Sequence, residues 1–381
     1  MKIILTGVET NNKGAELMLY AILQEIERSY PDAIVYLADE RIHQGISYIS
    51  TRVDFRILPF SRIEKKLRLN ALYWFLRIPY GLMPHCLATG RIDYVLDGSG
   101  FGFSDQFNTP SKYVKLLKKQ LSFYQRKRTK VVYLPQAFGP FKKELSKEIL
   151  SVISHYSSLL MPRERVSYEY LKESRVVNME KVKLFTDFTS LVSGVFPNKY
   201  NHLKGGVCII PNVQMINKGM ISYDDYVSLL EAIINEGNNS GRPVYLLNHE
   251  GKKDEQFCYR CQKSICDSIV VVTGLNALEV KGLISSAYIV VSSRFHGLAS
   301  ALNSCVPCLA TSWSHKYKEL FDDYGIKDGV LPLDDNSKAI EMMKHLLDET
   351  NNNSIRELLS SRVPIIKKTT REMWDTVWTC K

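Results

Sequence analysis

No stretch of the 381-residue sequence approaches the roughly 18–20 consecutive apolar residues that a membrane-spanning helix requires. The nearest run, from Leu69 to Met83, is interrupted by Arg77 and Pro79. The start of the chain lacks the pattern of a signal peptide, because a strand-length apolar run follows Lys2 directly and polar residues come soon after. We therefore expect a soluble, cytoplasmic protein.

Acidic residues are too few to balance the basic ones. There are 40 Asp and Glu against 50 Lys and Arg, which gives a formal net charge of +10. This excess favours an anionic partner, such as a phosphate-bearing substrate, an acidic membrane surface or nucleic acid. No recognisable nucleic-acid-binding module accompanies the charge, so we expect no nucleic-acid partner. Apolar residues at 45% and charged residues at 24% exclude a wholly disordered chain.

The sequence also lacks a convincing cluster of metal ligands, and we expect neither a metal nor a cofactor. Two CxxC units are present, at Cys258/Cys261 and at Cys305/Cys308, and zinc ribbons use such pairs. However, the first unit lies in a helical pattern and the second at a turn that enters a strand, whereas zinc knuckles usually come from glycine-rich hairpins. Buried, reduced thiols are the better interpretation.

Short β-rich runs alternate with helical patterns along most of the chain, which is typical of parallel βαβ units. We expect an α/β protein with two Rossmann-like, doubly wound domains that face each other across a cleft, a GT-B-like arrangement. The domains are predicted at residues 1–190 and 205–352, with a linker at 187–204 and a C-terminal helix in 353–381 that packs back on the first domain. The predicted strands are Ile3–Thr6, Ala33–Ala38, Phe55–Leu58, Tyr94–Leu96, Lys130–Leu134, Ser158–Met161, Val182–Phe185, Gly206–Pro211, Pro243–Leu247, Ser268–Val272, Ala287–Ser292 and Pro307–Thr311.

Polar and cationic residues follow the predicted strand that ends at Ser292. Arg294 and His296 stand between this strand and the next helix, where backbone N–H groups and the helix dipole suit an anion. An arginine can grip a carboxylate or phosphate with two parallel N–H bonds, and a histidine can exchange a proton near neutral pH. The alternative is that both residues only cap the helix and pair with a neighbouring acid, since an R-x-H pattern alone is weak.

Lys316 and Lys318 follow the next predicted strand. If the two strands are adjacent, these lysines reach the same edge as Arg294, and together with His296 they would form a phosphate trap. The alternative is that both lysines lie on an exposed helix face.

A glycine-rich segment follows the predicted strand Tyr94–Leu96. Gly98, Gly100 and Gly102 are each separated by one residue, which is not the G-x-G-x-x-G spacing of a dinucleotide site. The segment is either a substrate-binding loop or simply a tight turn from strand to helix.

Six segments, in the right order, resemble the polysaccharide pyruvyltransferase family. The N-terminal one places Asn-x-Gly-Ala-Glu at the start of the first helix, and the C-terminal one contains S-x-R-x-H-G, a V-P turn and a downstream lysine. Two positions depart from the family pattern: Ser99 replaces a more usual glycine, and Glu164 replaces an aspartate. The segments are GVETNNKGAELMLYAIL (7–23), DYVLDGSGFGFSD (93–105), YLPQAFGPF (133–141), RERVS (163–167), FTD (185–187) and SSRFHGLASALNSCVPCLATSWSHKYKELFDDYGI (292–326).

The resemblance implies transfer of a pyruvyl group from phosphoenolpyruvate to a sugar of a surface polysaccharide, such as a capsule or exopolysaccharide, or of its lipid-linked precursor. The product would be a pyruvate ketal. The first domain would hold the acceptor and the second the phosphoenolpyruvate. The implied roles are a general acid at His296, anion binding at Arg294, Lys316 and Arg163, a base or orienting group at Asp97 or Asp105, and further substrate contacts at Asn12, Gly14, Gly98, Gly100 and Lys318.

Residues 61–91 mix basic residues, among them Lys65 and Arg77, with aromatic and aliphatic ones such as Trp74. This pattern suits an anionic membrane surface, where a lipid-linked acceptor would be held. The alternative is a basic helix whose apolar face packs on the domain core.

A glycosyltransferase with a nucleotide-sugar donor is the chief alternative function, because the same two-domain architecture and phosphate-binding logic would serve it. Thermal stabilisation by phosphoenolpyruvate or by a sugar nucleotide discriminates between the two.

Overall fold

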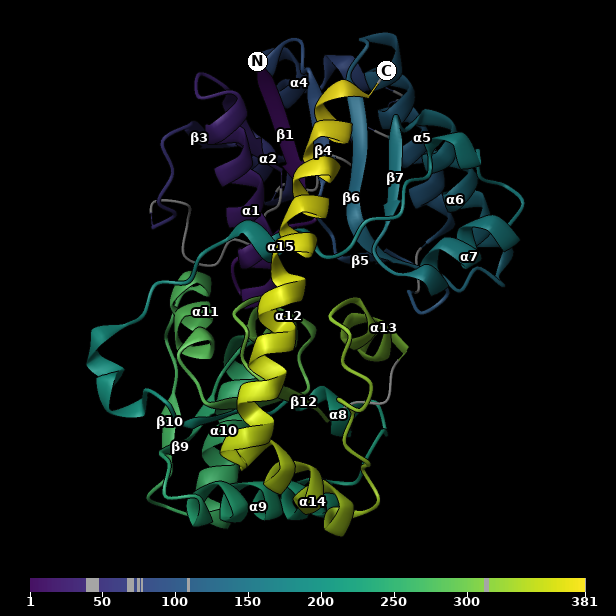
Figure 1. Cartoon of the computed structure of the whole chain (residues 1–381). Coiled ribbons are helices and arrows are strands. Elements are labelled where there is room, and N and C mark those ends of the chain that lie inside the picture. Colours follow the sequence, from purple (N-terminus) through teal and green to yellow (C-terminus); the bar gives the residue numbers. More distant parts are fainter. Residues whose placement is uncertain are drawn as a thin grey trace. The chain divides into compact units, whose positions relative to one another are not determined.

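The computed structural model describes residues 1–38, 48–66, 72–73, 76, 78–107, 110–311 and 315–380. The chain divides into two compact units, each built on a parallel sheet (Figure 1). The first unit consists of Met1–Thr10, Met18–Phe188 and Thr370–Lys381, and the second of Asn11–Leu17 and Thr189–Thr369.

The sheet of the first unit is entirely parallel and has the order β3-β2-β1-β4-β6, with β5 and β7 both paired to β6. The chain begins in the middle of the sheet and winds outward in both directions, and the direction changes between β1 and β4. Ligands of such sheets bind at the carboxyl ends of the strands beside this switch point. The strands are β1 (Lys2–Thr6), β2 (Ile34–Leu37), β3 (Asp54–Ile57), β4 (Tyr94–Asp97), β5 (Phe101–Phe103), β6 (Lys130–Phe138) and β7 (Leu159–Pro162).

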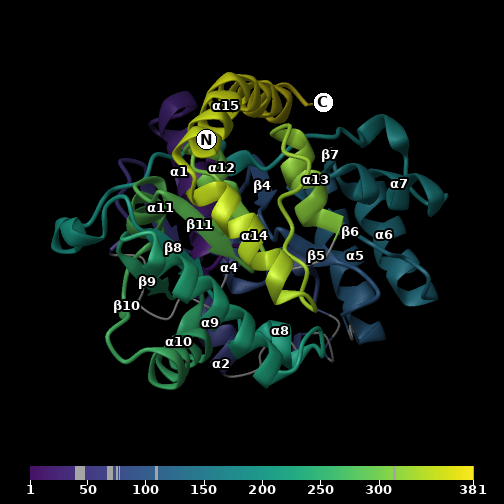
Figure 2. The ribbon, with the colours of Figure 1, turned by 60° about the horizontal axis from the view of Figure 1, so that its bottom comes forward.

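The sheet of the second unit repeats this winding in the order β10-β9-β8-β11-β12, again with every pair parallel. Valine and isoleucine dominate its strands, as expected of a sheet that is covered on both faces. The switch point lies between β8 and β11, and Figure 2 shows β8, β9 and β10 beside each other. The strands are β8 (Val207–Ile210), β9 (Val244–Leu247), β10 (Val270–Val272), β11 (Ile289–Ser292) and β12 (Cys308–Ala310).

Helices cover the sheet of the first unit, and α5 and α6 bury leucines and isoleucines against β4, β6 and β7. Among the small helices, a buried polar group holds α2, η1 and α4 together: His85 Nδ1 lies 2.9 Å from Glu64 Oε2, and its Nε2 lies 3.2 Å from the Tyr80 hydroxyl. The helices are α1 (Lys13–Ser29), α2 (Ser61–Lys66), η1 (Tyr80–Leu82), α4 (Pro84–Thr89), α5 (Ser111–Arg126), α6 (Glu144–Tyr156), α7 (Arg165–Glu173), η2 (Met179–Lys181) and η3 (Phe188–Leu191).

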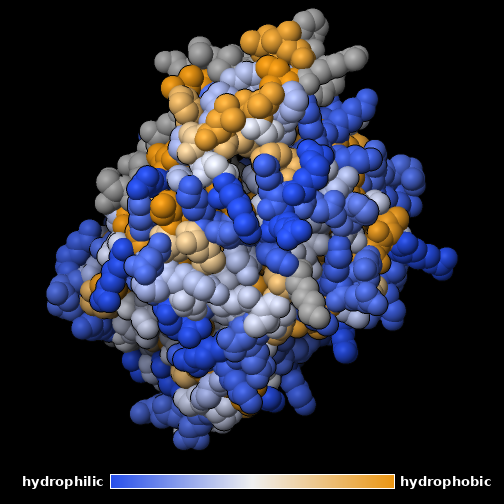
Figure 3. All heavy atoms as spheres, turned by 90° about the horizontal axis from the view of Figure 1, so that it is seen from above, coloured by the Kyte–Doolittle hydropathy of each residue, from blue (hydrophilic) through white to orange (hydrophobic). Residues whose placement is uncertain are grey.

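Several large apolar side chains around these small helices are exposed rather than buried, and Figure 3 shows hydrophobic side chains gathered on the surface of the molecule. Trp74 and Arg77, named in the predicted membrane-surface segment, lie outside the described residues, and so do the side chains of Lys65 and Lys66. Within the described part of the chain, no helix is both long enough and apolar enough to span a bilayer. The exposed apolar residues are Phe60, Ile63, Leu72, Leu76, Leu82 and Leu87.

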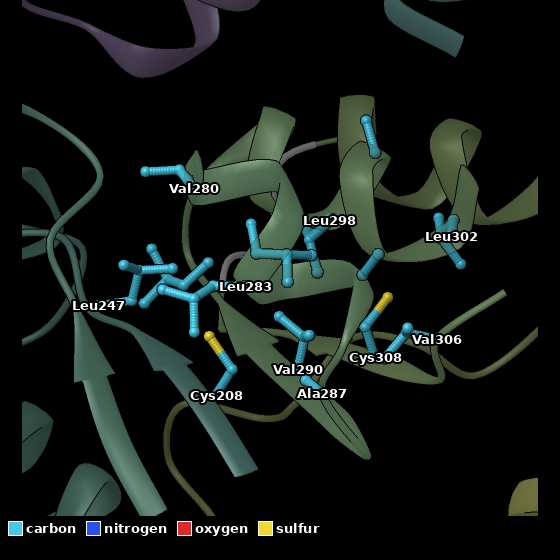
Figure 4. Close-up of a cluster of buried hydrophobic side chains, with 14 of the residues drawn as sticks. Cys208, Leu247, Val280, Leu283, Ala287, Val290, Leu298, Leu302, Val306 and Cys308 are labelled. Atoms are coloured by element: carbon cyan, nitrogen blue, oxygen red, sulfur yellow. The ribbon is translucent and has the colours of Figure 1, made fainter. Parts of the chain in front are cut away.

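Two hydrophobic clusters cover the two faces of the second sheet, because successive residues of a strand point to opposite sides. Cys208 and Ile210 belong to the cluster with α11, α12 and α13, part of which Figure 4 shows, whereas Val207 and Ile209 belong to the cluster with α9, α10 and α14. The helices are η4 (Asn198–Leu203), α8 (Gln214–Asn217), α9 (Tyr223–Asn239), α10 (Gly251–Ile265), α11 (Ala277–Ser285), α12 (Phe295–Asn303), α13 (His315–Asp323), α14 (Asn336–Leu347) and α15 (Glu349–Thr379).

The CxxC cysteines are divided between these two clusters. Cys258 and Cys261 pack from α10 on one face of the sheet, while Cys308 points to the other face from β12 and Cys305 packs beside it. Burial raises the pKa of Cys261 to about 12, so the thiol form is favoured. The two CxxC units are therefore separated by the sheet, and their side chains serve as core residues.

The predicted architecture of two Rossmann-like α/β domains is confirmed by the two parallel sheets. One predicted strand, Val182–Phe185, is wrong: it forms only an isolated bridge between Leu160 and Val182. The N–H groups of Lys183 and Phe185 donate to carbonyls of β7, but the segment forms no continuous ladder with that strand. The strand β5 was not predicted, because Gly102 interrupts its apolar pattern.

Two segments outside the sheets are also well packed. In the predicted linker, the carbonyl of Thr189 accepts a 3.0 Å hydrogen bond from the ammonium group of Lys281, which is buried on α11. At the end of α15, the indole N–H of Trp378 donates to Glu25 at 2.8 Å, and Trp374 is fully buried.

Candidate active site

Ser293 anchors the carboxyl end of β11 through buried hydrogen bonds. Its hydroxyl lies 2.7 Å from the hydroxyl of Tyr226, and its carbonyl accepts from the hydroxyl of Tyr317 at 2.8 Å and from the amide of Asn212 at 3.3 Å. Burial raises the pKa of Tyr226 to about 12, so this phenol keeps its proton. These bonds tie β11 to the carboxyl end of β8 and to α9 and α13, and they fix the backbone from which Arg294 and His296 project.

Arg294 caps α12 with extended backbone angles, and its own N–H donates to Ser292 Oγ at 2.9 Å. Its guanidinium is 14% exposed and forms ion pairs with Glu250 and Asp254, including a 3.1 Å bond from Nε to Asp254 Oδ2. Asp254 is fully buried, and its other oxygen accepts the N–H of Val213. Burial raises the pKa of Asp254, although Arg294 opposes this shift.

The guanidinium therefore forms ion pairs with two carboxylates. This agrees with the alternative interpretation, in which Arg294 caps the helix and pairs with a neighbouring acid. A guanidinium carries five N–H donors, and the contacts to Glu250 and Asp254 leave hydrogens on both terminal nitrogens. Anion binding by Arg294 stays a prediction.

His296 lies in the first turn of α12, directly against the start of α1. A Cβ atom on residue 14 would lie 2.3 Å from His296 Nδ1, which is far inside van der Waals contact. Only glycine leaves room for the imidazole at this point. Gly14 thus has a clear physical role in placing His296, whereas its predicted contact with substrate is not tested.

The same turn of α1 explains the rest of the Asn-x-Gly-Ala-Glu segment. The side chain of Asn12 accepts the N–H of Gly14 at 2.9 Å and so caps the helix. Glu16 is completely buried, binds the ammonium of Lys13 at 2.6 Å and accepts the N–H of Ala277 at the start of α11. Burial raises the pKa of Glu16, although Lys13 opposes this shift. This segment, which belongs to the second unit, therefore packs against the starts of α11 and α12.

His249 was missed by the sequence analysis, although it follows β9 just as Arg294 follows β11. It is 3% exposed, and its carbonyl accepts the N–H of Lys13 at 3.3 Å. Burial, together with the positive charges of Arg294, His296 and Lys13, holds the pKa of His249 well below its usual value. Its ring is therefore neutral, and among the described residues its Nδ1 has no hydrogen-bond partner. The rule that ligands bind at strand ends would have identified it.

The two predicted lysines lie in the first turn and a half of α13. Lys316 is half-buried, with its ammonium 5.0 Å from the ring centre of Tyr317, and Tyr317 in turn bonds to Ser293. Lys318 is exposed. Ser312, Trp313 and Ser314, in the same motif, lie outside the described residues. A shared pocket for Arg294, His296 and Lys316 stays a prediction.

Asp97 ends β4 at the switch point of the first sheet. Its carboxylate accepts from the Thr6 hydroxyl at 2.9 Å, the Ser99 N–H at 3.2 Å and the Gln136 amide at 3.1 Å. Burial raises the pKa of Asp97, while hydrogen bonds from Ser99, Thr6 and Gln136 oppose the shift. A half-buried carboxyl group that accepts hydrogen bonds from neutral donors is suited to accepting a proton.

The glycines after Asp97 are required by the local packing. A Cβ atom on Gly98 would lie 2.8 Å from Val8, and Gly100 has a φ of +68°, in the left-handed region that glycine tolerates. These features agree with the alternative of a tight turn, and substrate contact by either glycine is not tested.

Asp105 and Arg163 each have partners within the first unit. Asp105 accepts hydrogen bonds from the N–H groups of Lys142 and Lys143, at 2.6 and 3.1 Å, and from the hydroxyl of Ser146. Through these bonds Asp105 caps the start of α6. Partial burial acts to raise its pKa, but these hydrogen bonds outweigh it and the pKa of Asp105 is lowered. Arg163 is buried between Glu164 and Asp187, at 3.4 and 3.9 Å.

Among known protein families, the one described as polysaccharide pyruvyl transferase matches residues 12–315 of the chain. The chain belongs to the polysaccharide pyruvyl transferase family. The match begins at the helix cap Asn12 and ends in the first turn of α13, so it includes every candidate residue except Lys316 and Lys318. No curated protein sequence matches the chain significantly.

Solved structures of similar fold cover nearly the whole of this pyruvyl transferase family member. UDP-GlcNAc 2-epimerase from Neisseria meningitidis, bound to UDP-GlcNAc, is 13% identical with a TM-score of 0.61, and the matched region covers 99% of this chain and 100% of that one. HepE from Anabaena, in complex with UDP and glucose, is 12% identical with a TM-score of 0.58 and the same coverage. At such identities the likeness shows the fold alone, which is GT-B-like.

Proposed function

We propose that this member of the family transfers the pyruvyl group of phosphoenolpyruvate to a sugar of a surface polysaccharide or its lipid-linked precursor. The observation that supports this best is the group of Arg294, His296 and Lys13 around the buried His249 at the switch point of the second sheet. Phosphoenolpyruvate carries a carboxylate and a phosphate, and cationic donors at a strand end and helix N-terminus suit both.

The reaction requires a proton at the methylene carbon, C3. In the proposed sequence, protonated His296 gives this proton to C3, and C2 gains cationic character. The oxygen of one sugar hydroxyl bonds to C2 and loses its proton, the bond from C2 to the phosphate oxygen breaks, and the oxygen of the second hydroxyl closes the ketal. Of the two hydroxyl protons, one ends on the new methyl group and the other on phosphate, so the reaction is balanced without an oxidant or reductant.

The side chains divide this work by charge. Arg294, steadied by Asp254, offers its remaining N–H groups to the carboxylate or phosphate of the donor. The neutral His249 adds no charge to this group of cations, and His296 is the proposed general acid. Asp97 is the base proposed for the sugar hydroxyl, since its raised pKa brings it closer to the pH at which a proton acceptor works well.

The decisive experiment is incubation of the purified chain with phosphoenolpyruvate and galactose-type or mannosamine-type glycosides. We expect phosphate release in proportion to a product that is heavier by one pyruvyl unit, with acid-labile ketal signals in its NMR spectrum. Phosphate release without this product would indicate hydrolysis, and the absence of both with every acceptor class would contradict the proposal.

A nucleotide-sugar glycosyltransferase is the second candidate, because the solved structures of similar fold are complexes with UDP or UDP-sugars. Ligands that bind the folded state raise the melting temperature in proportion to their affinity. We expect stabilisation by phosphoenolpyruvate and none by UDP-GlcNAc or UDP-glucose. The reverse result would favour glycosyl transfer.

A lipid-linked acceptor would place the protein at a membrane surface, and the exposed apolar residues near α2, η1 and α4 fit such a contact. Ile63, Leu82 and Leu87 are all more than half exposed, and the surrounding sequence is rich in lysine and arginine. Apolar side chains beside basic ones bind anionic interfaces by burial and by charge together. We therefore include peripheral binding to an anionic bilayer in the proposal.

Flotation with phosphatidylglycerol vesicles tests this contact. We expect the wild type to float, the Leu82→Ser/Leu87→Ser and Trp74→Ser variants to float less, and an Ile365→Ser control on α15, also more than half exposed, to behave like the wild type. Equal flotation of all four proteins, or none by any, would remove the membrane contact and leave the transfer reaction untouched.

A further inference from the structure

A cavity of about 340 Å³ lies in the first unit, between β5 and the N-terminal ends of α5 and α6. Its volume falls at the small end of the roughly 300–1,000 Å³ that is typical of ligand-binding pockets. Four aromatic residues make up much of its wall, and two serines, a glycine, a proline and an isoleucine complete it. The lining residues are Gly102, Phe103, Ser104, Phe107, Pro110, Tyr113, Phe141, Ser146 and Ile149.

The aromatic side chains of this cavity are divided into a fixed floor and an open rim. Phe103 stacks on Phe138 with ring centres 6.1 Å apart, and Phe141 is buried, so both are held by the core. Phe107 and Tyr113, in contrast, are 44% and 38% exposed. Exposed rings at the mouth of a cavity gain the most by covering a ligand.

Polar groups within the cavity are available to a ligand. Ser104 is buried, and its hydroxyl oxygen accepts the N–H of Gln106 at 3.2 Å, which leaves the hydroxyl hydrogen as a donor. Gln136 is completely buried, and its Oε1 has no hydrogen-bond partner in the described part of the chain. A Cβ atom on Gly102 would lie 3.1 Å from the Cβ atom of Ser99 and 3.5 Å from this oxygen, so Gln136 lies directly behind the wall that Gly102 forms.

The cavity also adjoins the proposed base. The other end of the Gln136 amide donates to Asp97 at 3.1 Å, and Ser99, which also donates to Asp97, lies against Gly102.

We propose that this cavity binds a sugar ring of the acceptor, with Phe107 and Tyr113 covering the C–H face of the pyranose and the hydroxyl of Ser104 bonding to one of its hydroxyls. This inference rests on the proposed function, since it names the site for its acceptor. A pyranose combines an apolar face with a rim of hydroxyls, which matches aromatic walls with a few polar groups. An acyl chain would fill the same space but leave the hydroxyl hydrogen of the buried Ser104 without an acceptor, which is costly.

Octyl β-galactoside carries both candidate ligands, a pyranose ring and an alkyl chain, in one molecule. Saturation-transfer NMR below its micelle-forming concentration shows which of these two parts contacts the protein. We expect saturation to reach the ring protons of the galactoside more than the octyl chain. In the Phe107→Ala and Tyr113→Ala variants the ring signal should fall, and the Kd should rise about five- to tenfold, as for the loss of one aromatic contact. Tyr259→Ala, on exposed α10 surface, is the matched control and should bind as the wild type does.

The other outcomes have defined meanings. Saturation of the octyl chain alone, no saturation of either part, or an unchanged ring signal in both cavity variants would each overturn the sugar site. Circular dichroism of the variants excludes unfolding as the cause of lost binding. Because the binding experiment contains no phosphoenolpyruvate, its result is separate from that of the transfer assay: ring binding without pyruvyl transfer contradicts only the proposed function, and transfer without effect of Phe107 or Tyr113 contradicts only the site.

Discussion

The two parallel sheets share one winding order, but the residues at their switch points differ in charge. At the second sheet, Arg294, His296 and Lys13 meet, with buried acids such as Asp254 and Glu16 placed to hold the cations. At the first sheet, the neutral groups of Thr6, Ser99 and Gln136 donate hydrogen bonds to Asp97, and an aromatic cavity lies in the same unit. The difference teaches that one fold can place cationic side chains at one switch point and a carboxyl group among neutral donors at the other by changing only the loops at its strand ends.

The largest effect is expected at the cationic switch point, from His296→Gln. Glutamine keeps a similar length and polarity but cannot donate a proton, so we expect turnover to fall by about 10²–10⁴-fold, the usual contribution of a general acid or base. Stabilisation by phosphoenolpyruvate should remain. His202→Gln, at an exposed histidine of the same unit, is the control. Near wild-type turnover of His296→Gln would show that His296 is not the general acid, and the proposed difference between the two switch points would fail.

The matching change at the first sheet is Asp97→Asn. Asparagine can keep the bonds to Ser99 and Gln136, so the fold should persist while turnover falls, by about 10²-fold. Because the pKa of Asp97 is raised, the wild-type pH profile of kcat/KM should rise through a value above that of an ordinary aspartate, and this acidic limb should disappear in the variant. If the acidic limb of the kcat/KM profile is unchanged in Asp97→Asn, the limb belongs to another group. Asp267→Asn, at an exposed position, is the control.

A smaller effect is expected from Asp254→Asn, which removes one acid from the cationic switch point. The amide can still accept the N–H of Val213, but Arg294 loses its buried ionic partner and its fixed orientation. We expect the KM for phosphoenolpyruvate to rise about tenfold, equivalent to 1.4 kcal/mol, with kcat changed less. Glu250→Gln should have a weaker effect, since Glu250 is the more exposed partner. A fall in kcat at constant KM would contradict this positioning role.

The smallest effect concerns stability, through Asp105→Ala in the first unit. Loss of a helix cap costs about 0.5–2 kcal/mol, which urea unfolding at pH 7 can measure. Because the pKa of Asp105 is lowered by folding, its contribution is complete above the unfolded pKa of about 3.9 and is lost as the pH falls through the folded value. The wild type and the variant should therefore converge in stability at low pH. Loss of turnover in a folded Asp105→Ala protein would instead support a role in the reaction.

Much of the fold could be predicted because alternating apolar runs and helical periods are local properties. The strand that ends at Ser292 and the helix after His296 were both found in this way. The prediction of a strand at Val182–Phe185 was wrong because apolar character alone does not show whether a segment pairs along its length. This segment forms only one bridge. His249 was missed because a lone histidine after a strand carries no spacing signal, and its proximity to His296 depends on the adjacency of β9, β8 and β11.

By itself, the sequence determined the alternation of strands and helices, the two Rossmann-like domains and the family, because each follows from short patterns in a fixed order. Only the tertiary structure decided that Gly14 makes room for His296, that Arg294 is paired with Asp254, and that Asp105 caps a helix. Those partners are 37 to 282 residues apart in the chain. No local pattern encodes which distant groups will share a desolvated site.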